Sequence, residues 1–451
     1  MDKDNPGLHV PGPDAELLSH LFERCDRVLV KKLSNNDRDW ARFPNKHQAG
    51  VYIPSEQRDS GFFPDLKAMQ RRDPTAAEIR ERFFATIWPQ FGAEKCSRLV
   101  HYTSKGQETH LTRLPKEAFA ELLPASFLVM GRKQRDDTYS YECLSIDSAS
   151  EEADLLHATL DLKPDFLIEE YDPVRLKDQE RERVLAFTDE VISAWLAGEI
   201  KGFADSMAMP KTIELARMAR ACFLKSHGLE RLNPFELAVP GDVLCEISRS
   251  IELDIFWEFQ RRQRSVELIR VLLGDYPKEI GSSDVIRALI DQYQSVYALM
   301  RSATQQSRTR AGYSYEYQIE AMLAGGGIPF EKQVSLSSGR RSDFVLPSQV
   351  GLERPADPKQ PGLILSVKTT LRDRWKQVLS EQGEHELYLA TVDENIPATD
   401  IEEMASSNIH LVVPENLKTA KTSEYKGHDN VLSFKEFCDE VVAPRMPVWE
   451  S

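Results

Sequence analysis

The C-terminal part of this chain takes its predicted strand pattern from two segments, Asp343-Phe344-Val345-Leu346-Pro347 and Leu363-Ile364-Leu365-Ser366-Val367-Lys368. Each is an apolar run of strand length with an ionisable residue at one end. Glu381 follows Lys368 by 13 positions (381 − 368), after a segment, 372–380, that predicts a helix. Two carboxylates can hold a hard divalent cation that activates water, and a lysine can neutralise charge that develops on a phosphate. The pattern therefore predicts metal-dependent phosphodiester hydrolysis.

Each of these residues also has an ordinary interpretation. An aspartate at the start of a strand is more often a turn or capping residue. A lysine at the end of a buried strand is less usual, because a buried ammonium group needs a partner. The three groups together favour the catalytic interpretation over the structural one.

The segment Arg372-Asp373-Arg374 follows the lysine. It is either an ordinary charged helix start, with Asp373 near the positive helix end, or a reader of base pairs. Arginine can bind guanine O6 and N7 in bidentate fashion, and a carboxylate can accept from cytosine N4. Arg374 and Glu381 lie seven residues apart, on one face of the predicted helix. The segment is therefore a candidate for reading adjacent C·G pairs.

Three regions differ in their hydrophobic period. Residues 20–170 predict a β-rich region, with strands at 28–33, 49–54, 126–130 and 139–144. Residues 175–325 have helical spacing. From residue 313 the order predicted is helix, strand, loop, strand, helix, strand, strand, with helices at 313–323 and 372–380 and strands at 343–346, 363–367, 387–390 and 410–413. Alternating elements predict a mixed sheet flanked by helices. The expected domains are 20–172 and 173–451, the latter divided into a helical part for DNA binding or dimerisation, 173–310, and a catalytic core, 311–451.

Composition limits the class of protein. The net charge of −15 (57 basic minus 72 acidic side chains) argues against nonspecific coating of nucleic acid, although local basic clusters remain. The six cysteines contain no CxxC pair, which predicts reduced thiols and a cytoplasmic location. The sequence shows neither a secretory signal nor an apolar run of the ~20 residues that a membrane span needs.

The catalytic segment, Val367-Lys368-Thr369-Thr370-Leu371-Arg372-Asp373-Arg374-Trp375-Lys376-Gln377-Val378-Leu379-Ser380-Glu381, resembles that of the EcoRII family of type II restriction endonucleases. So do the segments 310–316 and 411–414. The resemblance implies a PD-(D/E)XK nuclease fold whose second acidic residue has moved onto the following helix. The family's proline before the aspartate is Ser342 here.

The resemblance also implies roles for individual residues. Asp343 and Glu381 would bind Mg²⁺, Lys368 would be the catalytic lysine, and Glu316 would support the site from the preceding helix. The DNA-binding residues of this domain would be Arg310, Arg372, Asp373, Arg374 and Arg249.

The N-terminal region is similar to the family's effector-binding domain, a β-pseudobarrel of the B3 type that grips DNA with two arms. The first arm would be 34–48, with an additional basic segment at 38–42, and the second about 105–113. A β-domain used for dimer contacts is the alternative for this region. The implied DNA-binding residues are Lys32, Ser34, Asn35, Asn36, Asp37, Arg38, His47, Gln48, Lys105, Glu108, His110 and Arg113.

The function expected from the resemblance is Mg²⁺-dependent cleavage of both strands of duplex DNA at a short site containing CC:GG, leaving 5′-phosphates. The enzyme would be a homodimer in the cytoplasm of a prokaryote, encoded with a cognate DNA methyltransferase. Its N-terminal domain would bind a second copy of the site and thereby relieve autoinhibition. Two alternatives remain open: a DNA-binding regulator with an inactive nuclease domain, and a nuclease that depends on modified cytosine.

Overall fold

The computed structural model describes residues 13–43, 50–69, 78–103, 108–135, 138–160, 162–163, 165–335, 341–355, 361–371, 375–376 and 385–449. The chain divides into two compact units. The first comprises Met1–Gln179 together with two short later segments, Glu394–Pro397 and Lys421–Glu424, and the second comprises the remainder. The sequence placed the boundary at 172–173, seven residues before the end of the first continuous segment (179 − 172).

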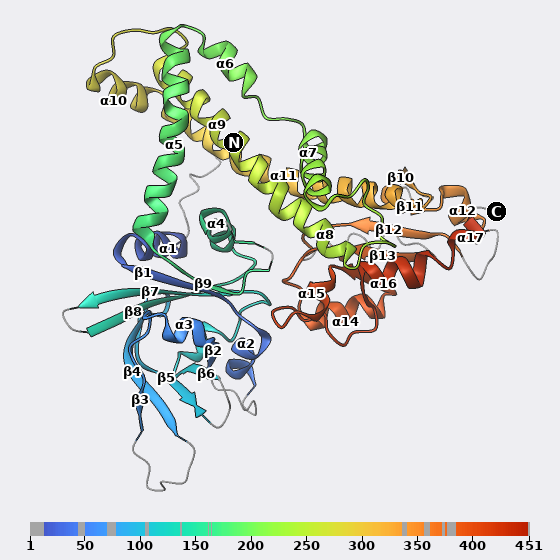
Figure 1. Ribbon diagram of the computed structural model, residues 1–451, viewed down its shortest axis with the longest axis horizontal. Helices are drawn as coiled ribbons and strands as arrows, with labels where there is room; N and C mark the ends of the chain where they lie inside the picture. The colour runs from blue at the N-terminus through green and yellow to red at the C-terminus, as the bar shows by residue number, and fades with distance from the viewer. Residues whose placement is uncertain are drawn as a thin grey trace, which may run out of the picture. The chain divides into compact units, whose positions relative to one another are not determined.

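The first unit is built on a nine-stranded, mostly antiparallel sheet in the order β2-β6-β5-β4-β8-β7-β1-β9, with β3 paired to β4 (Figure 1). One pair, β4 with β8, is parallel. The strands are β1 (Arg27–Lys32), β2 (Val51–Ile53), β3 (Lys67–Ala68), β4 (Ile79–Trp88), β5 (Ala93–Tyr102), β6 (Thr109–Thr112), β7 (Phe127–Arg135), β8 (Thr138–Ile146) and β9 (Ile168–Tyr171).

Short helices connect or cover these strands. They are α1 (Pro13–Arg24), α2 (Asn35–Arg42), α3 (Ser55–Asp59), η1 (Pro89–Phe91), η3 (Lys116–Ala118) and α4 (Glu151–Leu160). One core contains Trp88, Tyr141 and Leu99 from the strands and packs against Trp40 of α2. A second core lies on the other side of β1 and β7, where Val28 and Val129 meet α1 and α4. Alternation of inward side chains along β1 and β7 explains why one strand contributes to both cores.

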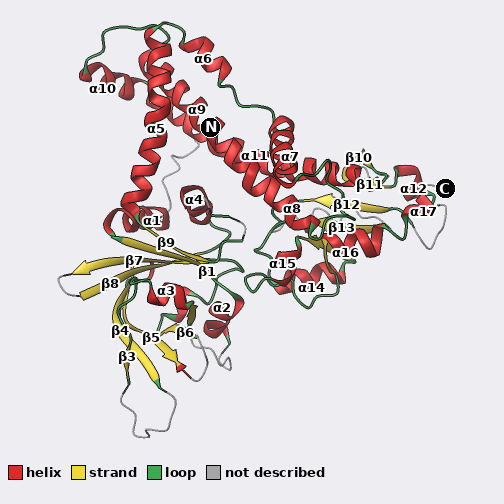
Figure 2. Ribbon diagram, in the orientation of Figure 1, coloured by secondary structure: helices red, strands yellow, loops and turns green. Residues whose placement is uncertain are grey.

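The second unit opens with helices (Figure 2). They are α5 (Pro173–Leu196, which begins in the first unit), α6 (Ile200–Ser206), α7 (Thr212–His227), α8 (Pro240–Glu246), the π-helical turn η4 (Ile247–Ile251), α9 (Glu252–Leu273), α10 (Ser282–Asp291) and α11 (Tyr293–Gly325). Gly326 caps α11, and Gly327 follows with φ +68°, a backbone conformation that glycine adopts without strain. The three consecutive glycines therefore end this helix as the sequence predicted.

A six-stranded sheet in the order β10-β11-β12-β13-β14-β15 follows. The pairs β10–β11 and β11–β12 are antiparallel, and β12 to β15 are parallel. The elements are β10 (Glu331–Ser335), β11 (Arg341–Leu346), α12 (Gln349–Glu353), β12 (Leu363–Val367), β13 (Glu386–Ala390), α14 (Ala398–Ser406), β14 (Ile409–Val413), α15 (Glu415–Thr419), β15 (Val431–Ser433), α16 (Phe434–Glu436), η6 (Phe437–Val442) and α17 (Met446–Trp449).

Helices cover this sheet on a shared core. Phe344 and Leu365 from neighbouring strands pack with Ile319 of α11, Leu244 of α8 and Phe437 of η6. All five residues of β12 are buried, as is usual for a central strand that is covered on both faces. The predicted mixed sheet flanked by helices is therefore confirmed for the second unit. No helix within the described ranges is long and apolar enough to cross a membrane.

Candidate active site and DNA-binding residues

Asp343 and Lys368 meet at the junction of β11 and β12. Oδ2 of Asp343 accepts a hydrogen bond from the backbone N–H of Val367 at 2.8 Å and lies 2.8 Å from Nζ of Lys368. The hydroxyl of Ser366 donates to the same oxygen at 3.3 Å. The backbone N–H of Lys368 donates to the carbonyl of Ala390 on β13, which fixes the position of the lysine at the end of β12. The antiparallel pairing thus brings together two residues that are 25 positions apart.

Glu316 approaches this pair from α11. Its Oε1 accepts a hydrogen bond from Nε2 of Gln333 at 2.8 Å. Burial raises the pKa of the Glu316 carboxyl, the Gln333 amide lowers it, and the negative charge of Asp343 raises it. Two carboxylates therefore lie close enough to repel each other, with the Lys368 ammonium beside them.

This donor set fits a hard divalent cation, since such ions prefer carboxylate oxygens and would relieve the repulsion between the two acids. The described residues include no cluster of three or more His, Cys, Asp or Glu side chains able to hold a metal. The predicted third member, Glu381, lies outside the described residues. Ser342, which stands where the family has proline, is fully buried, and its hydroxyl finds no hydrogen-bond partner among the described residues.

The predicted base-reading residues Arg372, Asp373 and Arg374 also lie outside the described residues. The residues on either side of them, Leu371 and Trp375, are buried. The backbone N–H of Leu371 donates to the buried carboxylate of Asp393 at 2.6 Å. Leu371 is thereby held to the loop that follows β13.

The two other arginines predicted to bind DNA in this domain have protein partners. Arg310 is 5% exposed; its guanidinium donates to Oε1 of the fully buried Glu252 at 2.7 Å and lies over the ring of Phe256. Arg249, in the π-helical turn, donates to the carbonyl of Val392 at 3.0 Å. Arg310 thus links α11 to α9 in this conformation, and its predicted DNA contact remains a prediction.

In the first unit, several residues of the predicted first DNA-binding arm are buried at the start of α2. Ser34 caps this helix and pairs with Asp37, whose carboxylate also accepts from the backbone N–H of Tyr52 at 2.7 Å and lies 3.3 Å from Nζ of Lys31. Asp37 and Arg38 are fully buried. The expected basic extension at 38–42 is therefore part of a packed helix.

The later segments of the first unit supply partners to this arm. Lys32, which is 3% exposed, lies 3.0 Å from a carboxylate oxygen of Glu394. Arg38 lies 3.0 Å from Glu424 and donates to the carbonyl of Leu122 at 2.9 Å. The side-chain amide of Asn35 donates to the carbonyl of Ser423 at 2.7 Å.

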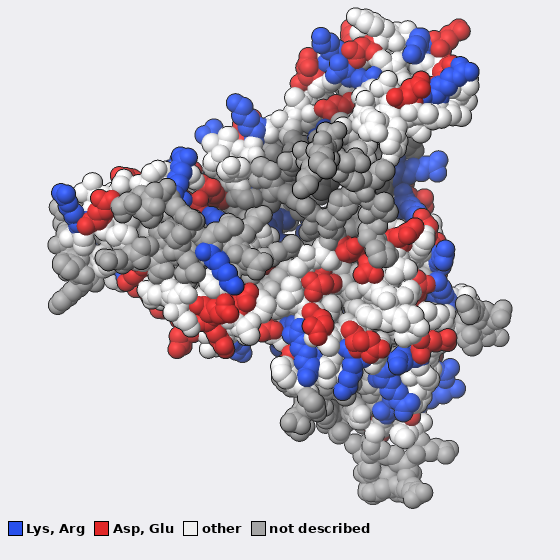
Figure 3. All heavy atoms as spheres, turned by 180° about the vertical axis from the view of Figure 1, so that it is seen from behind, with Lys and Arg blue, Asp and Glu red and all other residues white. Residues whose placement is uncertain are grey.

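The remaining predicted contacts of the first unit are more accessible. Asn36, Glu108 and Arg113 are exposed. Arg113 has φ +62° and stacks on the ring of Phe83, and His110 packs edge-on against Tyr52. His47, Gln48 and Lys105 lie outside the described residues. Figure 3 shows basic side chains gathering among acidic ones toward the end of the first unit that carries β3 to β5.

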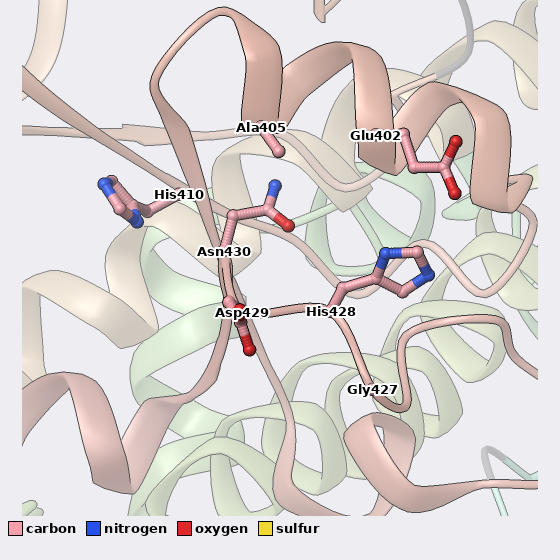
Figure 4. A pocket seen from close by; sticks show the side chains of 7 residues that line it. All are labelled: Glu402, Ala405, His410, Gly427, His428, Asp429 and Asn430. Carbon is pink, nitrogen blue, oxygen red and sulfur yellow. The ribbon is translucent and has the colours of Figure 1, made fainter.

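A hollow of about 500 Å³ in the second unit lies away from the Asp343 pair. It is found toward the amino ends of β14 and β15, whereas Lys368 follows the carboxyl end of β12. In Figure 4 the rings of His410 and His428 lie on different sides of the hollow and do not converge. Burial lowers the pKa of His410, which stacks on Tyr388. This hollow therefore has no part in the site described above.

Sequence reasoning missed two residues of the site. Ser366 left a signal, because it is the one hydroxyl in an otherwise apolar strand, but Gln333 left none. Only the pairing of β10 with β11 brings Gln333 beside Asp343, and the sequence did not predict β10.

The chain is similar to known proteins over the region that contains Asp343 and Lys368. The family described as "EcoRII C terminal" matches residues 276–438. The type II restriction enzyme SsoII of Shigella sonnei is 32% identical over 171 residues, which are 35% of this chain and 54% of SsoII, so the match spans about half of that relative. The type II restriction enzyme EcoRII of Escherichia coli is 23% identical over 403 residues, or 86% of this chain and 88% of EcoRII.

A solved structure of metal-depleted Ecl18kI in complex with uncleaved, modified DNA is 24% identical and covers 56% of this chain and 86% of its own, with a TM-score of 0.46. Both curated relatives are type II restriction enzymes. The resemblance to EcoRII-type restriction endonucleases is therefore confirmed.

Proposed function

We propose, from the match of residues 276–438 to the EcoRII C-terminal family, that this protein is a type II restriction endonuclease. The observation that carries the proposal is the contact of Asp343 with Lys368 at 2.8 Å, with the Glu316 carboxylate beside them. A DNA-binding regulator has no need of this arrangement, because two acids beside a lysine contribute little to binding an anionic duplex.

The substrate is duplex DNA with a short site containing CC:GG, and the products carry 5′-phosphates. Asp343, Glu316 and Glu381 would hold Mg²⁺. When bound, the cation supplies an activated water molecule and neutralises charge on the phosphate. Lys368 stabilises negative charge that develops on the scissile phosphate, and its contact with Asp343 holds the ammonium group in place. Ser366 and the Val367 N–H orient the Asp343 carboxylate.

Specificity would come from Arg372, Asp373 and Arg374, reading guanine and cytosine through hydrogen bonds. Each bidentate contact would contribute about 1–3 kcal/mol of discrimination.

The enzyme would act as a homodimer, since one chain contributes one Asp343–Lys368 pair and both strands are cut. The first unit would adopt the B3-like pseudobarrel and bind a second copy of the site as effector. Its nine-stranded sheet, which encloses the core that contains Trp88 and Tyr141, supports this proposal.

The test is digestion of plasmid DNA with and without Mg²⁺ by the wild type, by Asp343→Ala and by a control, Glu440→Ala, which removes an exposed carboxylate outside the site. Discrete fragments from the wild type and the control, and intact plasmid with Asp343→Ala, are expected. Intact plasmid with every protein, together with retained DNA binding, would favour a regulator. Cleavage of methylated plasmid alone would favour a modification-dependent nuclease.

A further inference from the structure

Gln333 occupies an unusual position beside the candidate active site. It lies on β10 between Lys332, which pairs with Phe344, and Val334, which pairs with Ser342. This register places Gln333 directly across from Asp343. The backbone of Gln333 has φ +57°, in the left-handed region that non-glycine residues rarely adopt.

The left-handed backbone explains where the Gln333 side chain goes. Lys332 forms an ion pair with Glu320 of α11, and Phe344 packs with residues of the same helix, so α11 covers that face of the sheet. In a regular strand the next side chain, that of Gln333, would point to the opposite face. Instead, its amide reaches Glu316 of α11 at 2.8 Å. Arg341 donates to the carbonyl of Gln333 at 3.0 Å and supports the irregular backbone.

We propose that Gln333 is a positioning residue that turns out of the regular strand to hold the Glu316 carboxylate beside Asp343, so that the two acids form one cation-binding pair. This inference rests on the proposed metal-dependent cleavage. Its amide engages one oxygen of Glu316, and the second oxygen can serve as a ligand. Backbone strain at a residue that orients a functional group is a common feature of active sites.

The role differs from that of a metal ligand. The contact that Gln333 makes in the site is a hydrogen bond from its amide nitrogen to Glu316, and that nitrogen is a donor, not a ligand for hard cations. Gln333 therefore acts through Glu316, as residues that orient metal ligands do. Its loss should weaken cation binding without removing either carboxylate.

The main variant is Gln333→Gly, in the full-length protein. Glycine adopts φ +57° without strain, so this change removes the amide while relaxing the backbone. Asn408, which also has φ +57° and lies in the second unit before β14, provides the matched control, Asn408→Gly. Gln333→Asn is the second variant, because asparagine tolerates the left-handed region and retains an amide on a shorter side chain.

The primary readout is binding of Mn²⁺ alone, measured by electron paramagnetic resonance, with Asp343→Ala as the reference for loss of the site. We expect Gln333→Gly to bind Mn²⁺ about tenfold more weakly than the wild type, as loss of outer-shell partners of metal ligands generally does. Gln333→Asn should show a smaller loss and Asn408→Gly none. Cleavage by Gln333→Gly should require a correspondingly higher Mg²⁺ concentration for half-maximal rate.

Mn²⁺ affinity of Gln333→Gly within a factor of about two of the wild type, with thermal unfolding unchanged, would overturn the proposal. Equal weakening of Mn²⁺ binding by Gln333→Gly and Asn408→Gly would also overturn the proposal, because the effect would then come from the backbone change and not from loss of the amide. If Gln333→Gly fails to fold, Gln333→Asn decides by the same criterion. Failure of the proposed function is recognised separately: the wild type would bind Mn²⁺ at the Asp343 site and leave DNA intact.

Discussion

At the scale of single residues, the candidate active site depends on contacts between residues that are distant in the sequence. Asp343 receives a backbone N–H, a hydroxyl and an ammonium group on one oxygen. These three donors fix the orientation of the carboxylate. A carboxylate held in this way needs little reorganisation when a cation or phosphate arrives, which favours catalysis through preorganised charge.

Lys368→Ala should abolish cleavage and retain DNA binding. The carboxylates remain, while the ammonium group that stabilises charge on the phosphate is lost. Single-turnover cleavage and gel-shift binding in Ca²⁺ measure the two effects separately. A parallel loss of binding and thermal stability would mean that Lys368 is mainly structural. Lys376→Ala, which removes an exposed lysine further along the chain, is the control.

At the scale of elements, helix ends and helix pairs explain much of the second unit. The amino ends of α8 and α15 exchange hydrogen bonds: the N–H of Asp242 donates to Glu415 at 2.9 Å, and the N–H of Asn416 donates to Asp242 at 3.0 Å. Burial raises the pKa of Asp242 to about 6, the Asn416 N–H lowers it, and the charge of Glu415 raises it. The second carboxylate oxygen of Asp242 is buried and finds no hydrogen-bond partner within the described part of the chain.

Asp242→Asn should therefore stabilise the protein near neutral pH. A folded-state pKa of about 6, against an ordinary value of 3.8, means that the folded form holds this proton more tightly. Ionisation then favours unfolding, so the stability contributed by the protonated group is lost as pH rises from about 4 to above 6. Thermal unfolding across this range should show an advantage of the variant at neutral pH that fades in acid. An advantage that is constant with pH would contradict the assignment, and Asp439→Asn, at an exposed position, is the control.

Because Arg310 links α11 to α9, its substitution should lower the stability of the fold, whereas loss of a DNA contact alone would not. Arg310→Met leaves the buried Glu252 without its cation, which should cost about 3–5 kcal/mol of stability. The double variant Arg310→Met/Glu252→Leu should recover most of the loss, because neither charge is then buried alone. Urea unfolding measures both. If the double variant is stable and yet binds DNA weakly, the predicted DNA contact of Arg310 holds in the complex.

The sequence predicted the elements whose pattern is local. The apolar run 363–367 is β12 residue for residue, and 387–390 and 410–413 lie within β13 and β14. The helix predicted at 313–323 begins 20 residues earlier, at Tyr293 (313 − 293), because residues 301–312 carry no large apolar side chain to define a face. Residues 347–361 were expected to be loop but contain α12, and β10 and α14 were missed.

The site was predictable where ionisable residues interrupt apolar strands, as Asp343 and Lys368 do. It was not predictable where a side chain depends on pairing between distant segments, as for Gln333. The burial of Arg38 could not be predicted from the sequence either, because its partners, Leu122 and Glu424, lie 84 and 386 positions away. Basic residues in a polar segment look exposed until their partners are known.

At the scale of the whole molecule, the first unit is discontinuous along the chain. Its two later segments bring Glu394 and Glu424 to Lys32 and Arg38. These carboxylates would compete with DNA phosphates for the same cations. Effector binding by this unit, as proposed above, would therefore have to replace protein carboxylates with phosphates.

Glu424→Ala should raise the affinity of the full-length protein for short duplex DNA, about two- to fivefold at low salt, as expected for loss of one partly exposed competing charge. Fluorescence anisotropy measures the change, with Lys368→Ala as the background so that DNA stays intact. Glu230→Ala, which removes an exposed carboxylate of the second unit, should have no such effect. Unchanged or weaker binding by Glu424→Ala would indicate that Arg38 is purely structural.

The discontinuity of the first unit also bears on how such enzymes could exchange parts in evolution. A gene segment that encoded only residues 1–179 would not specify the whole first unit. The protein made from it would lack the acidic partners of Lys32 and Arg38, which lie in the later segments. Recombination at that boundary would place two desolvated cations in a foreign setting. Lineages that acquired a new recognition module by such a crossover would have to inherit matching acidic loops from the donor, or evolve them anew.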